Sequence, residues 1–268
     1  MKVIVTHDVD HIRVFEHKKD LIIPKFWIRS FIEFSLGYVT YQELKRRFSD
    51  FLHDKWHNLT ELMQFDKRKG VPSTFFIGVS KGRGLAYSLS NAEFWIKKII
   101  EEGFKVGVHG ISFEDYSGIK REYETFKKIS GLGNFGIRMH YLKINDKTLS
   151  ILNEIGYLYD SSIYELSNPF KVGDLWEFPL SLMDGYIFNK NSRYQDQNLK
   201  QVKDATKEII EKAFINNLKY FTLLFHDRYF SDSFWTWREW YVWLVEYLKE
   251  SKIEFITFEE AIKEMEGA

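Results

Sequence analysis

The chain has 268 residues, 44% of them hydrophobic and 28% charged, a balance that suits one large globular domain or two small ones. It contains no cysteine, which excludes disulfides, thiolate metal sites and a cysteine nucleophile, so any metal must be held by histidine and carboxylate. Lysine plus arginine and aspartate plus glutamate each number 38, and this balanced charge argues against nucleic acid as the main partner.

Short apolar runs alternate with helical patterns along the chain. The first run is too short for a signal peptide, and no run reaches membrane-spanning length, so we expect no membrane span and a cytoplasmic location. The runs predict strands at residues 3–5, 73–77, 105–108, 135–137, 157–159, 176–178, 221–225 and 253–256.

The helical patterns between these runs carry start and stop signals. Ser90 to Glu93 and Thr257 to Glu260 have the spacing of capping boxes, and the first of these helices is expected to stop at Gly103. Asn145 is expected to cap a helix that ends before Gly156. Two longer helices are predicted at 199–217 and 235–250.

Repeated strand–helix units predict an α/β fold with parallel strands. Seven or eight such units favour a closed (β/α) barrel, with an open doubly wound sheet as the alternative. We expect one domain over residues 1–268, with a helical insertion at 11–69 after the first strand. This insertion either forms a lid or wall at the site or packs only against the outside of the barrel.

Polar side chains gather where the predicted strands end. Five of the eight histidines lie at or just past such ends: His7, His11, His109, His140 and His226. Arg138 and Asp160 occupy similar positions. Because a barrel collects the carboxyl ends of its strands at one face, we expect these side chains to share one site. Carboxylates beside several imidazoles are the composition of a hydrolytic site.

Asp8 and Asp10 stand two residues apart at the end of the first strand. In an extended chain both side chains point to the same side, because side chains alternate with period two. One carboxylate can then bind a cation while the other acts as a base on water. A capping or turn role for Asp10 is the alternative.

Two other patterns are set aside as functional sites. His53 and His57 have the four-residue spacing of helical metal ligands, but no third ligand is evident and we interpret them as surface residues. No Gly-x-Ser-x-Gly elbow occurs, which argues against a serine nucleophile.

In order along the chain, these motifs resemble those of the polysaccharide deacetylase family (carbohydrate esterase family four, the NodB homology domain), whose fold is a distorted seven- or eight-stranded barrel. The resemblance rests on Thr6 to Asp10, on His109, on Arg138 to Tyr141, on Asp160 with Ser161, and on Phe225 with His226. It spans most of the chain from Val3 to about Phe258, apart from the insertion.

The resemblance implies metal-assisted hydrolysis of an amide. Asp8 matches the general base, Arg138 the residue that orients it, and His226 the acid that protonates the leaving amine, with Asp160 among the catalytic motifs. Asp10 and His109 match metal ligands, and the ion would be divalent, most commonly zinc. His11, His140 and Tyr141 are expected to bind substrate, a carbohydrate or small acylated amine.

The sequence departs from the family pattern at the metal. Phe113 replaces the second metal histidine, and the second aspartate is displaced by one residue to Asp10, so the ligand set is incomplete. His11, His140 or Glu114 could supply the third ligand; otherwise the site is free of metal.

Three functions therefore stay open. The first is a hydrolase of carbon–nitrogen bonds other than peptide bonds, most simply a deacetylase of an acylated amino sugar or polysaccharide, with an allantoinase-like, metal-independent amidohydrolase as a variant. The second is a non-catalytic carbohydrate-binding descendant, and the third is an unrelated barrel enzyme such as a sugar isomerase.

Overall fold

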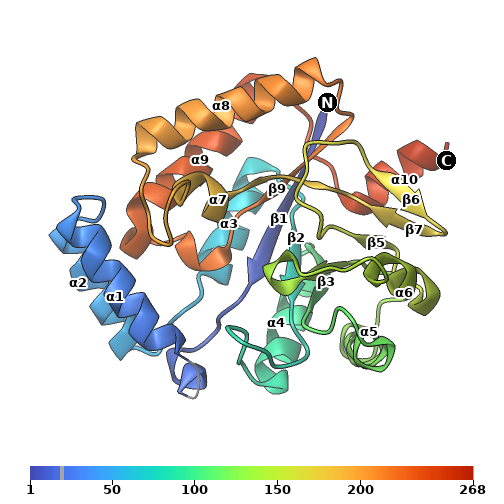
Figure 1. Ribbon diagram of the computed structural model, residues 1–268, viewed down its shortest axis with the longest axis horizontal. Coiled ribbons are helices and arrows are strands. Elements are labelled where there is room, and N and C mark those ends of the chain that lie inside the picture. The colour runs from blue at the N-terminus through green and yellow to red at the C-terminus, as the bar shows by residue number, and fades with distance from the viewer. Residues whose placement is uncertain (19–20, 268) are drawn as a thin grey trace.

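A single curled sheet forms the centre of the computed structural model, which describes residues 1–18 and 21–267 (Figure 1). Its strands are β1 (Lys2–Val9), β2 (Thr74–Ile77), β3 (Lys105–Gly110), β4 (Ile137–Met139), β5 (Tyr159–Asp160), β6 (Phe170–Val172), β7 (Leu175–Glu177), β8 (Leu180–Met183) and β9 (Tyr220–Leu224). They lie in the order β6-β7-β5-β4-β3-β2-β1-β9-β8. All neighbours are parallel except β6 and β7.

The predicted distorted barrel is confirmed in this curled form. β8 and β6 are the two edges of the ladder, and a single bridge between Tyr164 and Leu180 links the segment after β5 to β8. Because a single bridge replaces a full strand pairing there, the sheet curls toward a barrel but does not close completely.

Most predicted strands are confirmed, with shifts of up to two residues at β4 and β5. The strands β6 and β8 were not predicted. The strand predicted at 253–256 was wrong, because this segment forms one bridge, Phe255 to Val3, before the chain turns into the cap at Thr257.

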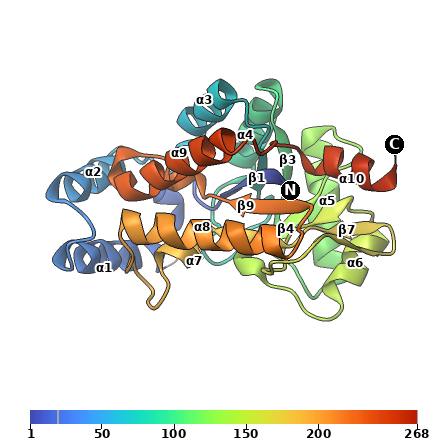
Figure 2. The ribbon, with the colours of Figure 1, turned by 90° about the horizontal axis from the view of Figure 1, so that it is seen from above.

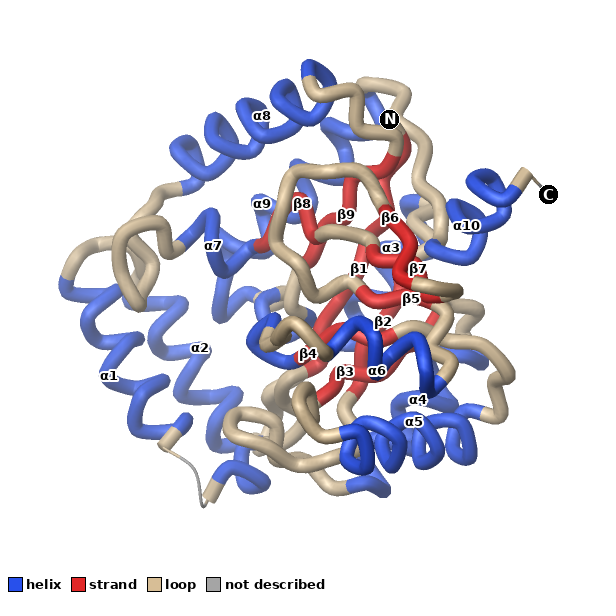
Figure 3. Tube along the Cα trace, turned by 45° about the vertical axis from the view of Figure 1, so that its right-hand side comes forward, coloured by secondary structure: helices blue, strands red, loops and turns tan. Residues whose placement is uncertain are grey.

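Helices surround the sheet, as the tube view shows (Figure 3). They are α1 (Ile22–Ser35), α2 (Tyr41–Leu52), α3 (Leu59–Lys69), α4 (Leu89–Glu101), α5 (Tyr116–Ser130), α6 (Thr148–Ile155), α7 (Asp184–Phe188), α8 (Leu199–Ile215), α9 (Trp235–Glu250) and α10 (Phe258–Glu266). Short 3₁₀ turns lie at Val14–His17, His140–Leu142, Asp227–Tyr229 and Asp232–Phe234. No helix in the described ranges is long and apolar enough to cross a membrane.

The capping signals were correct at α10 and wrong at two other helices. Thr257 and Glu260 form the predicted box. α4 is capped by Ser88, whose hydroxyl accepts from the backbone of Asn91, so the box predicted at Ser90 does not exist. α6 begins three residues after Asn145, whose side chain accepts from the Lys147 backbone in a turn that precedes the helix.

The two faces of β1 explain how the fold exposes a polar site. Val3, Val5 and Val9 belong to the large core between the sheet and its helices, whereas Ile4 belongs to an aromatic cluster inside the curl. Thr6 and Asp8 continue the inner face toward the carboxyl end of the strand. The amino end of the interior is therefore filled by apolar side chains and its carboxyl end by polar ones.

The segment between β1 and β2 contains three helices of two kinds. α3 directly precedes β2 and packs as a crossover helix with Leu59, Leu62 and Met63 in the core. α1 and α2 lie side by side at one end of the molecule (Figures 1 and 2). α1 and α2 thus occupy only part of the interval 11–69.

Candidate active site

The polar strand ends converge on a cavity of about 380 Å³. Its lining includes Asp8, Asp10, His109, His140 and His226, which come from β1, β3 and the segments after β1, β4 and β9. With Tyr141, which also lines this cavity, the structure brings together six of the residues that the sequence analysis singled out.

Asp8 is held by a buried arginine from β4. Arg138 Nη1 donates to Asp8 Oδ1 at 3.1 Å and to Thr6 Oγ1 at 2.6 Å. Its Nε donates to the Ser161 carbonyl and its Nη2 to the Ser161 hydroxyl, each at 2.8 Å. The guanidinium is fixed on all sides, so one oxygen of Asp8 is tied down while Oδ2 lies 3.9 Å from His109 Nε2.

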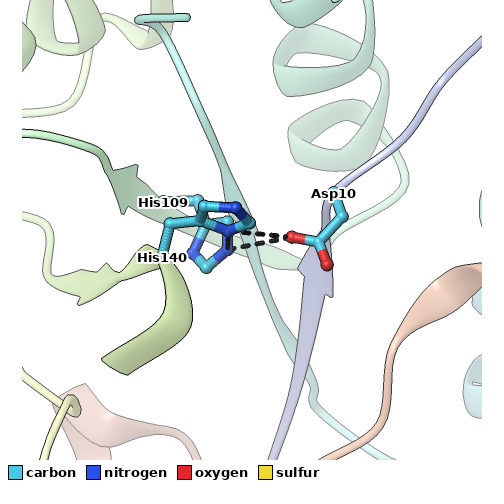
Figure 4. A group of neighbouring side chains, drawn as sticks. All are labelled: Asp10, His109 and His140. Atoms are coloured by element: carbon cyan, nitrogen blue, oxygen red, sulfur yellow. Dashed lines mark hydrogen bonds and ion pairs between the residues drawn. The ribbon is translucent and has the colours of Figure 1, made fainter. Parts of the chain in front are cut away.

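Three potential metal-ligand atoms, from Asp10, His109 and His140, meet at one point (Figure 4). Asp10 Oδ1 lies 3.1 Å from His109 Nε2 and 3.2 Å from His140 Nδ1, and the two ring nitrogens are 3.0 Å apart. Ligands at about 2.0–2.1 Å from one zinc ion have roughly this separation from one another.

The opposite nitrogens of both rings are already occupied. His109 Nδ1 lies 3.0 Å from the Arg138 carbonyl, and His140 Nε2 lies 3.0 Å from the Arg83 carbonyl. A carbonyl only accepts, so each ring donates there, and in the neutral form its other nitrogen is a bare lone pair. Two lone pairs facing a carboxylate at these distances fit a cation between them, and carbonyl partners of this kind orient metal-bound histidines.

The charge on Asp10 suits this role. Burial alone would raise the pKa of Asp10, but His140, His109 and His226 together hold the pKa of that carboxyl well below its usual range. Burial lowers the pKa of His109, yet Asp8 and Asp10 outweigh it and raise that pKa overall. The point between these groups therefore attracts positive charge, whether a proton or a metal ion.

The other side of the cavity carries an imidazole with a charged partner. His226 Nδ1 lies 2.8 Å from Asp184 Oδ1, and the His226 backbone donates to Asp184 Oδ2 at 2.7 Å. Burial would lower the pKa of His226, but Asp184 and then Asp10 and Asp8 raise it well above its usual value. His226 Nε2 is left facing the cavity, 3.6 Å from Asp10 Oδ2.

Asp184 is a site residue that the sequence analysis missed. It follows β8 directly, and its side chain is fully buried. The signal was an apolar run, 180–183, that ends in an aspartate like the other strand ends.

Asp160 does not reach the cavity. It lies opposite Glu177 on β7 and accepts from the Ser162 hydroxyl at 2.6 Å. Burial raises the pKa of both carboxyls. Asp160 directly precedes Ser161, whose carbonyl and hydroxyl accept hydrogen bonds from Arg138.

The remaining predicted residues divide between a second cavity and the surface. His11 is buried against Trp56 with Nδ1 3.1 Å from His17 Nε2, and it lines the second cavity. Tyr141 is half exposed and lines both cavities. Glu114 is exposed, and it is absent from the lining of the first cavity.

Three other histidines lie outside the site. His7 points to the opposite face of β1, where Nε2 lies 2.9 Å from Asp66 Oδ2. His53 is exposed, as predicted. His57 is half-buried against Trp95, and burial lowers its pKa to about 4, so its interpretation as a surface residue was wrong.

Proteins of known structure share this fold at low sequence identity. A protein from Mycobacterium smegmatis provisionally assigned as a polysaccharide deacetylase has a TM-score of 0.61 and 17% identity, over 96% of this chain and 92% of its own. The PuuE allantoinase has a TM-score of 0.61 and 12% identity, over 97% and 87%. A family four (CE4) pseudoenzyme from Bacillus anthracis has a TM-score of 0.51 and 11% identity, over 97% and 64%.

The chain therefore has the polysaccharide deacetylase fold, as the resemblance predicts. No protein-family model matches it, and no curated protein sequence matches it either. Because proteins with this fold include a provisionally assigned deacetylase, an allantoinase and a pseudoenzyme, the fold alone does not select an activity, which has to be argued from the site.

Proposed function

We propose that this chain is a divergent member of the polysaccharide deacetylase family, a metal-dependent hydrolase that cleaves the amide of an acylated amino sugar. The observation that carries the proposal is the convergence of Asp10, His109 and His140 between a buried Asp8–Arg138 pair and a His226–Asp184 pair. These groups supply a cation site, a base and an acid around one cavity.

Asp10, His109 and His140 would hold the divalent ion, with zinc the best match to two imidazoles and one carboxylate. When bound, such an ion polarises an acyl carbonyl and lowers the pKa of water. His140 then supplies the ligand that is lost because Phe113 replaces the second metal histidine of the family pattern. Of the two roles that the sequence left open for His140, substrate contact and third ligand, this proposal adopts the second.

The acid and base roles follow from which atoms are free. Asp8 Oδ2 faces the cation site, so Asp8 accepts a proton from the attacking water while Arg138 holds the carboxylate in position. His226 carries a proton at Nε2 and donates it to the amine as the C–N bond breaks. The products are a carboxylate and a free amine.

The proposal is tested by metal analysis and acetate release together. We expect the purified protein to contain about one zinc-like ion per chain and to release acetate from acetylated amino sugars, and both Asp8→Asn and His226→Ala to lower turnover by about 10²-fold or more without unfolding. An exposed-histidine variant, His53→Ala, is the matched control. Undiminished activity in both site variants would falsify the proposal.

The alternatives give different results in the same assays. A carbohydrate-binding pseudoenzyme would bind sugar without releasing acetate. A metal-independent, allantoinase-like hydrolase would retain its activity after chelation, and His140→Ala would not change its turnover.

A further inference from the structure

A second cavity of about 470 Å³ opens beside the first and shares Asp10 and Tyr141 with it. α1 forms one wall, and the loop between α7 and α8 contacts that helix where Arg29 Nη2 donates to Asn189 Oδ1 at 3.3 Å. We call this cavity the α1 groove. It extends from Asp10, in the proposed cation site, along α1.

Four cations line the α1 groove, and within the described ranges only Arg29 is paired with a carboxylate, that of Glu33. Lys25, Arg193 and Arg228 line it, and none of them has an ion-pair partner among residues 1–18 and 21–267. Of its lining residues only Asp10 is acidic, and Asp10 belongs to the proposed cation site. A cluster of uncompensated cations favours an anionic ligand.

Arg228 is held in place by aromatic rings. Its guanidinium carbon lies 5.1–5.6 Å from the ring centres of Phe26, Trp56, Tyr229 and Phe234. Its Nε is buried and has no hydrogen-bond partner. A planar guanidinium that is fixed without being neutralised suits the bidentate recognition of a phosphate.

The wall formed by α1 is apolar where a surface helix is ordinarily polar. Ile28 and Ile32 line the groove although 61% and 36% of their surface is exposed. Leu21, which precedes the helix, and Phe31 on it are 70% and 49% exposed. Exposed apolar surface that continues from a cationic groove is typical of a site for an amphiphile.

We propose that the α1 groove binds an apolar chain that is joined to the acylated sugar through a phosphate ester. The phosphate lies at Arg228 and Arg193, the chain follows Ile28 and Ile32, and the sugar enters the first cavity past Asp10. The substrate is then a lipid-linked sugar phosphate. The identity of the sugar rests on the proposed function, whereas the binding of the phosphate and the chain does not.

The test uses octyl phosphate, which has no amide and cannot be turned over, below its micelle-forming concentration. Calorimetric titration of the purified protein is expected to show binding that Arg228→Gln weakens by about tenfold or more, because a charge-assisted hydrogen bond is lost. Ile28→Ser is expected to weaken it severalfold, from loss of about one apolar side chain. Arg121→Gln and Ile215→Ser, at exposed positions outside the groove, are the matched controls.

Several results would overturn the inference, whatever the activity of the protein. If inorganic phosphate bound as tightly as octyl phosphate, the groove would not recognise the apolar chain. If octyl glucoside bound as tightly as octyl phosphate, the groove would not recognise the phosphate. Binding that is lost in His109→Ala and retained in Arg228→Gln would place the phosphate on the metal. Groove binding without any acetate release would contradict the proposed function and leave this inference standing.

Discussion

The two sides of the cavity use histidine in opposite ways. On one side, His109 and His140 each donate to a backbone carbonyl, which fixes the ring without adding charge. On the other side, His226 donates to the carboxylate of Asp184, and this carboxylate raises the pKa of His226 well above the usual value. The partner of the distant nitrogen thus favours either a lone pair or a proton on the near nitrogen, although at His109 the nearby Asp8 and Asp10 also raise the pKa of the ring.

Removing a ring on the carbonyl side is expected to have the largest effect. His140→Ala should lose the metal and lower turnover by at least about 10³-fold, since a metal ion contributes several kcal/mol to stabilising the charge that develops. Elemental analysis and acetate release measure the two effects. Full metal occupancy in this variant would show that His140 is not a ligand, and His53→Ala controls for loss of any histidine.

Removing the ring on the carboxylate side is expected to separate chemistry from metal binding. His226→Ala should lower kcat by about 10²–10⁴-fold, the range for loss of a general acid, with the metal content unchanged. The same two assays apply. If this variant also lost its metal, the contrast between the two sides would be wrong.

Changing only the partner of His226 is expected to have an intermediate effect. Asp184→Asn should lower kcat by about tenfold to hundredfold, because a charge-assisted hydrogen bond becomes a neutral one. His226 acts as an acid only while protonated, so activity is lost as the pH rises through its pKa. Since Asp184 raises that pKa, the alkaline limb of the kcat–pH profile should move to lower pH in the variant, and an unmoved limb would exclude Asp184 from this role.

The smallest effect is expected at the residue that lies against His140. Gly84 has φ +85°, and a Cβ there would lie 2.5 Å from the Tyr141 hydroxyl and 3.4 Å from His140 Nε2. Gly84→Ala should cost about 1–2 kcal/mol of stability and weaken metal binding severalfold. Gly103→Ala has the same backbone strain at φ +88° with no neighbour within 4 Å, so it should change the thermal midpoint alone.

The sequence was most informative where the strand–helix rhythm is regular. Parallel strands bring their carboxyl ends to one edge, which is why Asp8, His109 and His226 could be grouped before their distances were known. The roles of His140 and Asp184 could not be assigned in the same way. His140 reaches Asp10 through a 3₁₀ turn in which Tyr141 adopts φ 59°. Non-glycine residues seldom adopt this left-handed conformation, so the turn could not be predicted from the sequence.

Asp184 was missed because β8 is short and follows a proline. Pro179 stands before Leu180, and prolines ordinarily mark the limits of strands in a sequence. The Asp160 prediction illustrates the opposite problem. It stands at a strand end like the others, yet its neighbour Glu177 comes from a strand that pairs beside it, and such a pairing is not visible from the local pattern.

The pairing of β1 with β9 has a consequence for folding kinetics. Lys2 pairs with Tyr220 and Thr6 with Leu224, so Asp8 and His226 become neighbours only when segments more than two hundred residues apart have met. Contacts of such long sequence separation form slowly. During refolding from denaturant, the helical circular dichroism signal should therefore recover before the proposed hydrolytic activity does. During synthesis, β9 would have to leave the ribosome before the proposed site could form.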